Sequence, residues 1–155
     1  MRRAGWTTAL AACIMGTFAA EAPARQSPTG SPPANAAVRS DTLRSTQSGV
    51  FTEAQAKRGA QTYAGICQSC HTPSEHTGAQ FNQSWNARPL SDLFVYLCQN
   101  MPKDNPGSLD PADAVDVMAF LLKLNAMPAG AQELAPDSLA LKKILIDTRT
   151  TRPTP

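Results

Sequence analysis

Apolar residues recur at helical spacing over residues 117–124 and predict a helix with one buried face. The members of this stripe are Val117, Met118, Leu121 and Leu124. Asp110 precedes the stripe as a capping residue, and Pro111 takes the first helical position, where its missing N–H costs nothing. We therefore predict a helix that begins at Pro111 and ends before a turn-rich segment.

An earlier helix is predicted to begin after Thr52, whose hydroxyl can cap it while Gln55 reaches back as the third helical residue. It should run to about residue 63 or 65. Gly59 and Tyr63 lie one turn apart on one face, and a glycine inside a helix costs about 1 kcal/mol relative to alanine. We therefore expect another helix to approach closely here, with Phe120 packed against Gly59 and Tyr63.

A further helix is predicted between these two. Ser91 is its expected cap, and Asp92 places a negative charge in the first turn, near the positive end of the helix dipole. Leu90 and Val95 are spaced to form a hydrophobic staple. This helix should end near Asn100.

The start of the chain has the features of a secretory leader. It opens with Met1-Arg2-Arg3, continues with no charge over residues 4–20, and offers Ala22-Pro23-Ala24 as a small-x-small cleavage signal. We therefore predict a signal peptide over residues 1–24 and a periplasmic protein.

Composition divides the remaining residues into three parts. Residues 25–49 are rich in Pro, Ser and Thr with hardly any large apolar residue, which predicts a disordered linker. Residues 50–126 hold the three predicted helices and form one domain. Residues 127–155 form a C-terminal extension, in which residues 138–146 are expected to make a short helix or strand.

Charge argues against some classes of partner. The 155 residues have a formal net charge of +2, but residues 50–125 contain five basic and seven acidic residues, and five minus seven gives −2. Nucleic acid binding and long-range steering toward a strongly acidic partner are therefore not expected. We expect docking of redox partners through a modest apolar patch instead.

The candidate chemistry lies in the run Cys67-Gln68-Ser69-Cys70-His71. Each thiol can add to one vinyl group of a porphyrin as a thioether, and the histidine that follows can supply a neutral nitrogen to the iron. The run therefore predicts one haem c, covalent through Cys67 and Cys70, with His71 as an iron ligand.

Two other interpretations of the cysteine pair are disfavoured. A redox dithiol of the thioredoxin type would follow a strand, and the sequence has no strand-like run near Cys67. A structural zinc site would need a second pair of ligands, and the other histidine, His76, stands alone.

Met101 is the predicted second iron ligand. A thioether would complete a His/Met pair, which raises the potential and leaves no open position on the iron. Pro102 favours an extended conformation at Met101, so that a loop can present its side chain. Among the rivals, Met118 is better explained as core, Met127 is a weaker competitor, and His76 would have to cross the haem plane.

Residues 72–89 are expected to form a loop that contains Phe81, Trp85 and Arg88. The indole N–H of Trp85 and the guanidinium of Arg88 are candidate donors to a haem propionate. The alternatives, Trp85 as core and Arg88 as a surface charge, stay open.

Two cysteines lie outside the motif. Leu10-Ala11-Ala12-Cys13 matches a lipobox, and its use would make the chain a lipoprotein anchored to a bacterial membrane through Cys13. Cys98 lies in an apolar helical stretch and is predicted to be a small buried residue.

These features resemble the class I cytochrome c family over about residues 50–126. The similarity rests on Gly59 and Tyr63 before the cysteine motif, on Met101-Pro102, and on Phe120 in the last helix. It implies an all-α cytochrome c fold, with three main helices around one haem and flexible N-terminal and C-terminal extensions. It also supports His71 and Met101 as the iron ligands.

A narrower resemblance, to small bacterial mono-haem cytochromes associated with quinoprotein alcohol or sugar dehydrogenases, is carried by Trp85 and by residues 90–97, 101–102, 106–109 and 116–124. It implies an electron carrier rather than an enzyme, which passes single electrons from a dehydrogenase toward a terminal oxidase or another cytochrome. Two alternatives are a haem-bearing subunit of a membrane-tethered oxidoreductase complex and a haem enzyme or gas sensor whose sixth ligand position opens.

Overall fold

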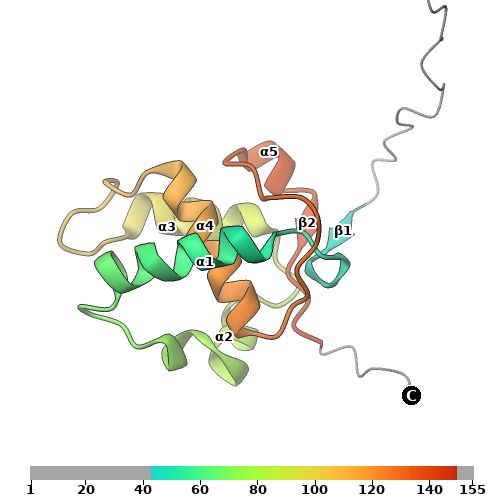
Figure 1. Cartoon of the computed structure of the whole chain (residues 1–155), viewed down its shortest axis with the longest axis horizontal. Helices are drawn as coiled ribbons and strands as arrows, with labels where there is room; N and C mark the ends of the chain where they lie inside the picture. Colours follow the sequence, from blue (N-terminus) through green and yellow to red (C-terminus); the bar gives the residue numbers. More distant parts are fainter. Residues whose placement is uncertain (1–42, 150–155) are drawn as a thin grey trace, which may run out of the picture. The chain divides into compact units, whose positions relative to one another are not determined.

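The computed structural model describes residues 43–149, which form a helical domain (Figure 1). Its elements are β1 (Arg44–Ser45), η1 (Thr46–Ser48), α1 (Glu53–Thr62), η2 (Tyr63–Cys67), η3 (Pro73–His76), α2 (Gly78–Trp85), α3 (Leu90–Asn100), α4 (Pro111–Leu124), α5 (Ser138–Leu141) and β2 (Ile144–Leu145). The predicted all-α class is confirmed, because helices dominate and the strands are two residues long. The predicted signal peptide and Cys13 lie outside the described residues. None of the described helices is both long enough and apolar enough to span a membrane.

Helix α1 begins as predicted, because Thr52 Oγ1 accepts a hydrogen bond of 3.0 Å from the backbone N–H of Gln55. The helical path continues without a break into the π-helical turn η2, where the N–H of Gln68 donates to the carbonyl of Tyr63. This continuity carries the chain from the cap at Thr52 directly to Cys67.

Helices α1 and α4 cross in contact with each other, as Figure 1 shows. A Cβ atom at Gly59 would lie 1.8 Å from the carbonyl oxygen of Asp116, so only glycine permits this approach. One turn later the rings of Tyr63 and Phe120 pack with their centroids 5.3 Å apart. The expected glycine-aromatic crossing is therefore confirmed.

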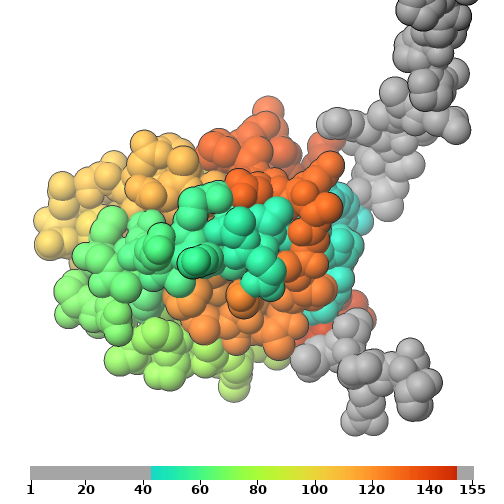
Figure 2. Space-filling view, in the orientation of Figure 1, coloured from blue at the N-terminus to red at the C-terminus, as the bar shows by residue number. Residues whose placement is uncertain are grey.

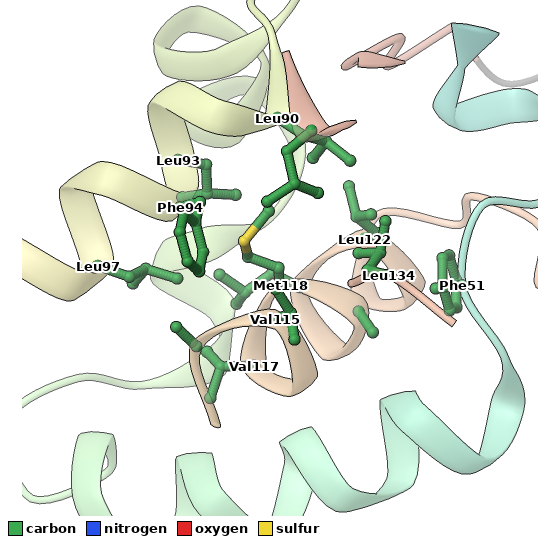
Figure 3. Packing of buried hydrophobic residues seen from close by; sticks show 14 of the residues in the cluster. Phe51, Leu90, Leu93, Phe94, Leu97, Val115, Val117, Met118, Leu122 and Leu134 are labelled. Atoms are coloured by element: carbon green, nitrogen blue, oxygen red, sulfur yellow. The ribbon is translucent and has the colours of Figure 1, made fainter. Parts of the chain in front are cut away.

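Helix α4 also follows the prediction at both ends. The carboxylate of Asp110 accepts a hydrogen bond of 2.8 Å from the backbone N–H of Ala112, and Pro111 is the first helical residue. In the core, Met118 packs among Leu90, Leu93, Phe94 and Leu122 (Figure 3). Its assignment as a core residue is confirmed.

The predicted start of α3 is wrong. The helix begins at Leu90 after Pro89, whose carbonyl accepts the N–H of Asp92, and Ser91 is a buried residue of the first turn. The staple is wrong as well, because Leu90 is fully buried while Val95 is 39% exposed. Pro89 is extended and its carbonyl faces the helix, so a residue with no side-chain donor or acceptor holds the cap position. The predicted end near Asn100 is confirmed.

Residues 72–89 are not one loop, which corrects a second expectation. They contain η3 and α2, and α2 buries Phe81 against the core. Asn125, just past α4, holds both elements: its side-chain oxygen accepts the N–H of Gly78, and its amide donates to the carbonyl of His76. These long-range contacts stabilise a helix whose sequence has few helix signals.

The extension after residue 126 is not flexible over its described part, residues 127–149. Five of its apolar side chains are buried: Met127, Leu134, Leu141, Ile144 and Ile146. Strand β2 pairs in parallel with β1, with Arg44 opposite Ile144 and Ser45 opposite Leu145. Residues 44–49, which were predicted to be the end of the linker, therefore belong to the folded domain. Figure 2 shows part of the extension beside α1 on one face of the domain.

Candidate functional site

An apolar pocket of about 900 Å³, counted to its open mouth, lies beside η2. Its walls come from η2, α2, α3, the loop after α3, and α4. The residues that line it include Tyr63, Ile66, Cys67, Cys70, His71, His76, Phe81, Trp85, Leu93, Tyr96, Leu97, Met101, Leu109, Val117 and Leu121.

The cysteine motif forms one tight turn at the edge of this pocket. The carbonyl of Cys67 accepts hydrogen bonds from the N–H groups of Cys70 and His71, at 3.1 Å and 2.9 Å. The turn therefore brings both thiols and the imidazole to one wall. Both cysteines carry free thiols, and burial raises the pKa of Cys67.

The imidazole of His71 lies against two neighbours. Its Nδ1 atom is 3.4 Å from Oε2 of Glu75, and its ring centroid is 5.1 Å from that of His76. His76 also lines the pocket and is half-buried, and its pKa is lowered first by this burial and then by the charge of His71. His76 and His71 thus lie side by side at the pocket wall.

Met101 lines the same pocket from the loop after α3. Its backbone is extended, with φ −123° and ψ 150°, as expected for a residue before proline. Its N–H donates to the carbonyl of Leu97, which ends the helix and turns the side chain toward the core. The pocket therefore brings a thioether together with the two thiols and the imidazole.

Trp85 and Arg88 have different positions. Trp85 lines the pocket and packs edge-on against Tyr96, with ring centroids 5.6 Å apart. Arg88 is absent from the pocket wall: its guanidinium lies over the ring of Trp85, 5.0 Å from the ring centroid, and pairs with Asp92 at 2.9 Å. The proposed role of Trp85 toward a propionate stays a prediction. For Arg88 the observed contacts favour the alternative of a surface charge.

Several pocket residues were not singled out by sequence reasoning as site residues, among them Ile66, Tyr63 and Tyr96. Ile66 and Tyr96 line the mouth and are 39% and 41% exposed, and Tyr63 forms part of the inner wall. Ile66 directly precedes the cysteine motif and Tyr96 lies within α3, and no spacing rule marks either residue. Their common property is an apolar side chain beside the pocket, which only the fold reveals.

The pocket residues fit a covalently bound haem. Two thiols, an imidazole and a thioether surround one apolar cavity, and these are the side chains that c-type attachment and iron ligation use. Cys67 and Cys70 would hold the porphyrin as thioethers, and the apolar walls would exclude water from it. Haem, when bound, supplies a one-electron couple at its iron.

The comparisons agree with this chemistry. Residues 54–121 match the family model described as cytochrome C oxidase, cbb3-type, subunit III. Comparison with curated proteins and with solved structures gave no match. Such a domain carries covalently bound haem, transfers electrons and works with redox partner proteins, and it is not itself a catalytic enzyme. Residues 54–121 therefore form a c-type cytochrome domain.

Proposed function

We propose that this protein is a periplasmic mono-haem cytochrome that takes single electrons from a dehydrogenase and passes them toward a terminal oxidase. The observation that carries the proposal is the gathering of Cys67, Cys70, His71 and Met101 around one apolar pocket. Cys67 and Cys70 would hold the porphyrin, and His71 and Met101 would ligate its iron. With both ligands in place, the haem would exchange electrons and would offer no open position to a substrate.

The environment of the pocket supports this role. Its walls are apolar, and a haem shielded from water changes charge with little rearrangement of solvent around it. At the pocket, Ile66 and Tyr96 are exposed apolar side chains, where a partner can dock without strong charge steering. A quinoprotein alcohol or sugar dehydrogenase is the donor that the narrower sequence resemblance favours.

A second candidate is a haem-bearing subunit of a membrane-tethered oxidoreductase complex. It is favoured by the description of the matching family model, which names an oxidase subunit. The two candidates differ in whether the protein leaves its partner between turnovers. Stoichiometric copurification with an oxidoreductase through a high-salt wash supports the subunit, and release of the protein supports the mobile carrier.

The proposed function is tested on protein purified from the periplasm of a host that matures c-type cytochromes. Mass spectrometry should find one haem added to the chain, and acidic acetone should not extract the colour. The reduced protein should bind carbon monoxide poorly, whereas Met101→Ala should bind it readily and lose the sulfur-to-iron charge-transfer band in the near red. Ready binding by the unmodified protein would instead indicate a haem enzyme or gas sensor.

A further inference from the structure

The carboxylate of Glu75 lies beside the imidazole that faces the pocket. Its Oε2 atom is 3.4 Å from Nδ1 of His71, and its other oxygen, Oε1, accepts a hydrogen bond of 3.0 Å from the hydroxyl of Thr72. The backbone N–H of Glu75 also donates to the carbonyl of Thr72 at 3.1 Å. The carboxylate is therefore held at both oxygens, one by the hydroxyl and one by the imidazole.

The local fold explains this arrangement. Thr72 is extended, with φ −93° and ψ 145°, and Pro73 opens the 3-10 turn η3. This turn places Glu75 four residues after His71, with their side chains on one side of the chain. Asn125 fixes the far end of η3 by donating to the carbonyl of His76. The position of Glu75 is thus set by the backbone rather than by the ion pair alone.

A carboxylate at this position has a defined effect on the imidazole. When Nδ1 carries the proton, it donates to Glu75, and Nε2 keeps its lone pair for a metal. A negatively charged acceptor also makes the ring a stronger electron donor than a neutral acceptor would. A stronger donor stabilises ferric more than ferrous iron, because the ferric ion carries the higher charge.

We propose that Glu75 is a positioning residue that fixes the proton of His71 on Nδ1 and lowers the midpoint potential of the haem. This inference rests on the proposed function, in which His71 binds the iron. Both side chains are partly exposed, 32% for His71 and 46% for Glu75, so water screens the pair and limits the effect.

The test compares Glu75→Gln with the unmodified holoprotein by spectroelectrochemical titration. Glutamine keeps the size and the acceptor oxygen but removes the charge. The midpoint potential should rise by an amount equal to about a tenfold loss of ferric preference, or about 59 mV for a one-electron couple. Glu53→Gln is the matched control: it also removes one carboxylate charge, but Glu53 pairs with Lys123 at the start of α1, away from the pocket wall.

A second measurement separates ligand strength from general charge. In the Met101→Ala background, the ferrous iron–histidine stretching frequency should fall when Glu75 is changed to glutamine and should not change in Glu53→Gln. Equal potentials for the unmodified protein and Glu75→Gln would overturn the inference, as would equal shifts in both glutamine variants or an unchanged stretching frequency.

Failure of the proposed function would give a different experimental result from failure of the role of Glu75. It would be seen in the unmodified protein as the absence of covalent haem, or as ready carbon monoxide binding. An intact near-red band in Glu75→Gln together with an unchanged potential would overturn the role of Glu75 alone.

Discussion

At the scale of single residues, Tyr63 links the helix crossing to the pocket. Its ring packs against Phe120 on one side and edge-on against His76 on the other, with centroids 5.9 Å apart for the second pair. Its hydroxyl is buried and has no hydrogen-bond partner among the described residues. Burial first, and the charges of Cys67 and Glu75 after it, raise the pKa of Tyr63 to about 12, so the phenol stays neutral.

This orphan hydroxyl gives a stability prediction. A buried polar group without a partner costs about 1–3 kcal/mol of desolvation, and phenylalanine keeps the ring while removing the group. Tyr63→Phe should therefore raise the free energy of unfolding by about 1 kcal/mol, measured by denaturant titration. Tyr96→Phe is the control, because Tyr96 is 41% exposed and its hydroxyl is expected to matter little. A loss of stability in Tyr63→Phe would mean that the hydroxyl has a partner in solution.

At the scale of elements, the crossing of α1 and α4 positions the cysteine motif, because η2 continues α1 directly into Cys67. The backbone contact at Gly59 sets how closely the two helices approach, and the Tyr63–Phe120 contact one turn later adds an aromatic pair. A change in this crossing would move the whole motif relative to the loop that holds Met101.

The two glycines before the motif should respond differently to alanine. At Gly59 a methyl group would collide with the backbone of Asp116, and overpacking of this kind costs about 1–3 kcal/mol, which exceeds the gain of about 1 kcal/mol in helix propensity. At Gly65 no atom lies within 4 Å of the added methyl group. Unfolding followed by circular dichroism should show a lower midpoint for Gly59→Ala than for the unmodified protein. The midpoint of Gly65→Ala should not be lowered. Equal midpoints would show that the helices can separate freely.

At the scale of the whole described domain, its first and last described segments bind to each other. The hydroxyl of Thr46, which is fully buried, accepts the N–H of Asp147 at 2.9 Å, and Gln47 donates to the carbonyl of Asp147 at 2.7 Å. Gly49 and Gly130 also meet closely, since a Cβ at Gly130 would lie 2.0 Å from the carbonyl oxygen of Gly49. Residues 44–49 and 127–149 therefore stabilise each other.

The stability that these contacts contribute should depend on pH. Arg149, by its hydrogen bonds to the carboxylate, lowers the pKa of Asp147 from 3.8 to about 2. A lowered pKa stabilises the fold above the unfolded value of 3.8, and this contribution is lost as the pH falls toward 2. In unfolding titrations at neutral pH and near pH 2, Arg149→Ala should lose stability at neutral pH and little at the acidic end. An equal loss in the free energy of unfolding of Arg149→Ala at both pH values would contradict this assignment.

Sequence reasoning succeeded where local chemistry decides the outcome. Thr52 and Asp110 cap their helices because a side-chain oxygen three or two residues away satisfies a free N–H, and this requires no distant partner. The cysteine motif likewise identifies its own chemistry, because the spacing of thiols and imidazole is fixed by covalent attachment. The glycine-aromatic crossing was predictable because a glycine inside a helix has a cost that a close contact explains.

Long-range packing decided the rest. Helix α2 depends on Phe81 in the core, and Pro89 at the start of α3 bridges to Leu145. The C-terminal extension folds because β2 pairs with a strand about a hundred residues earlier. The placement of Arg88 on Trp85 and of Glu75 against His71 also required the backbone path. The sequence by itself determined the attachment chemistry and the caps of α1 and α4, since these depend on neighbours along the chain. Only the tertiary structure decided which side chains line the pocket and which ends are folded, because those contacts join residues that are far apart in sequence.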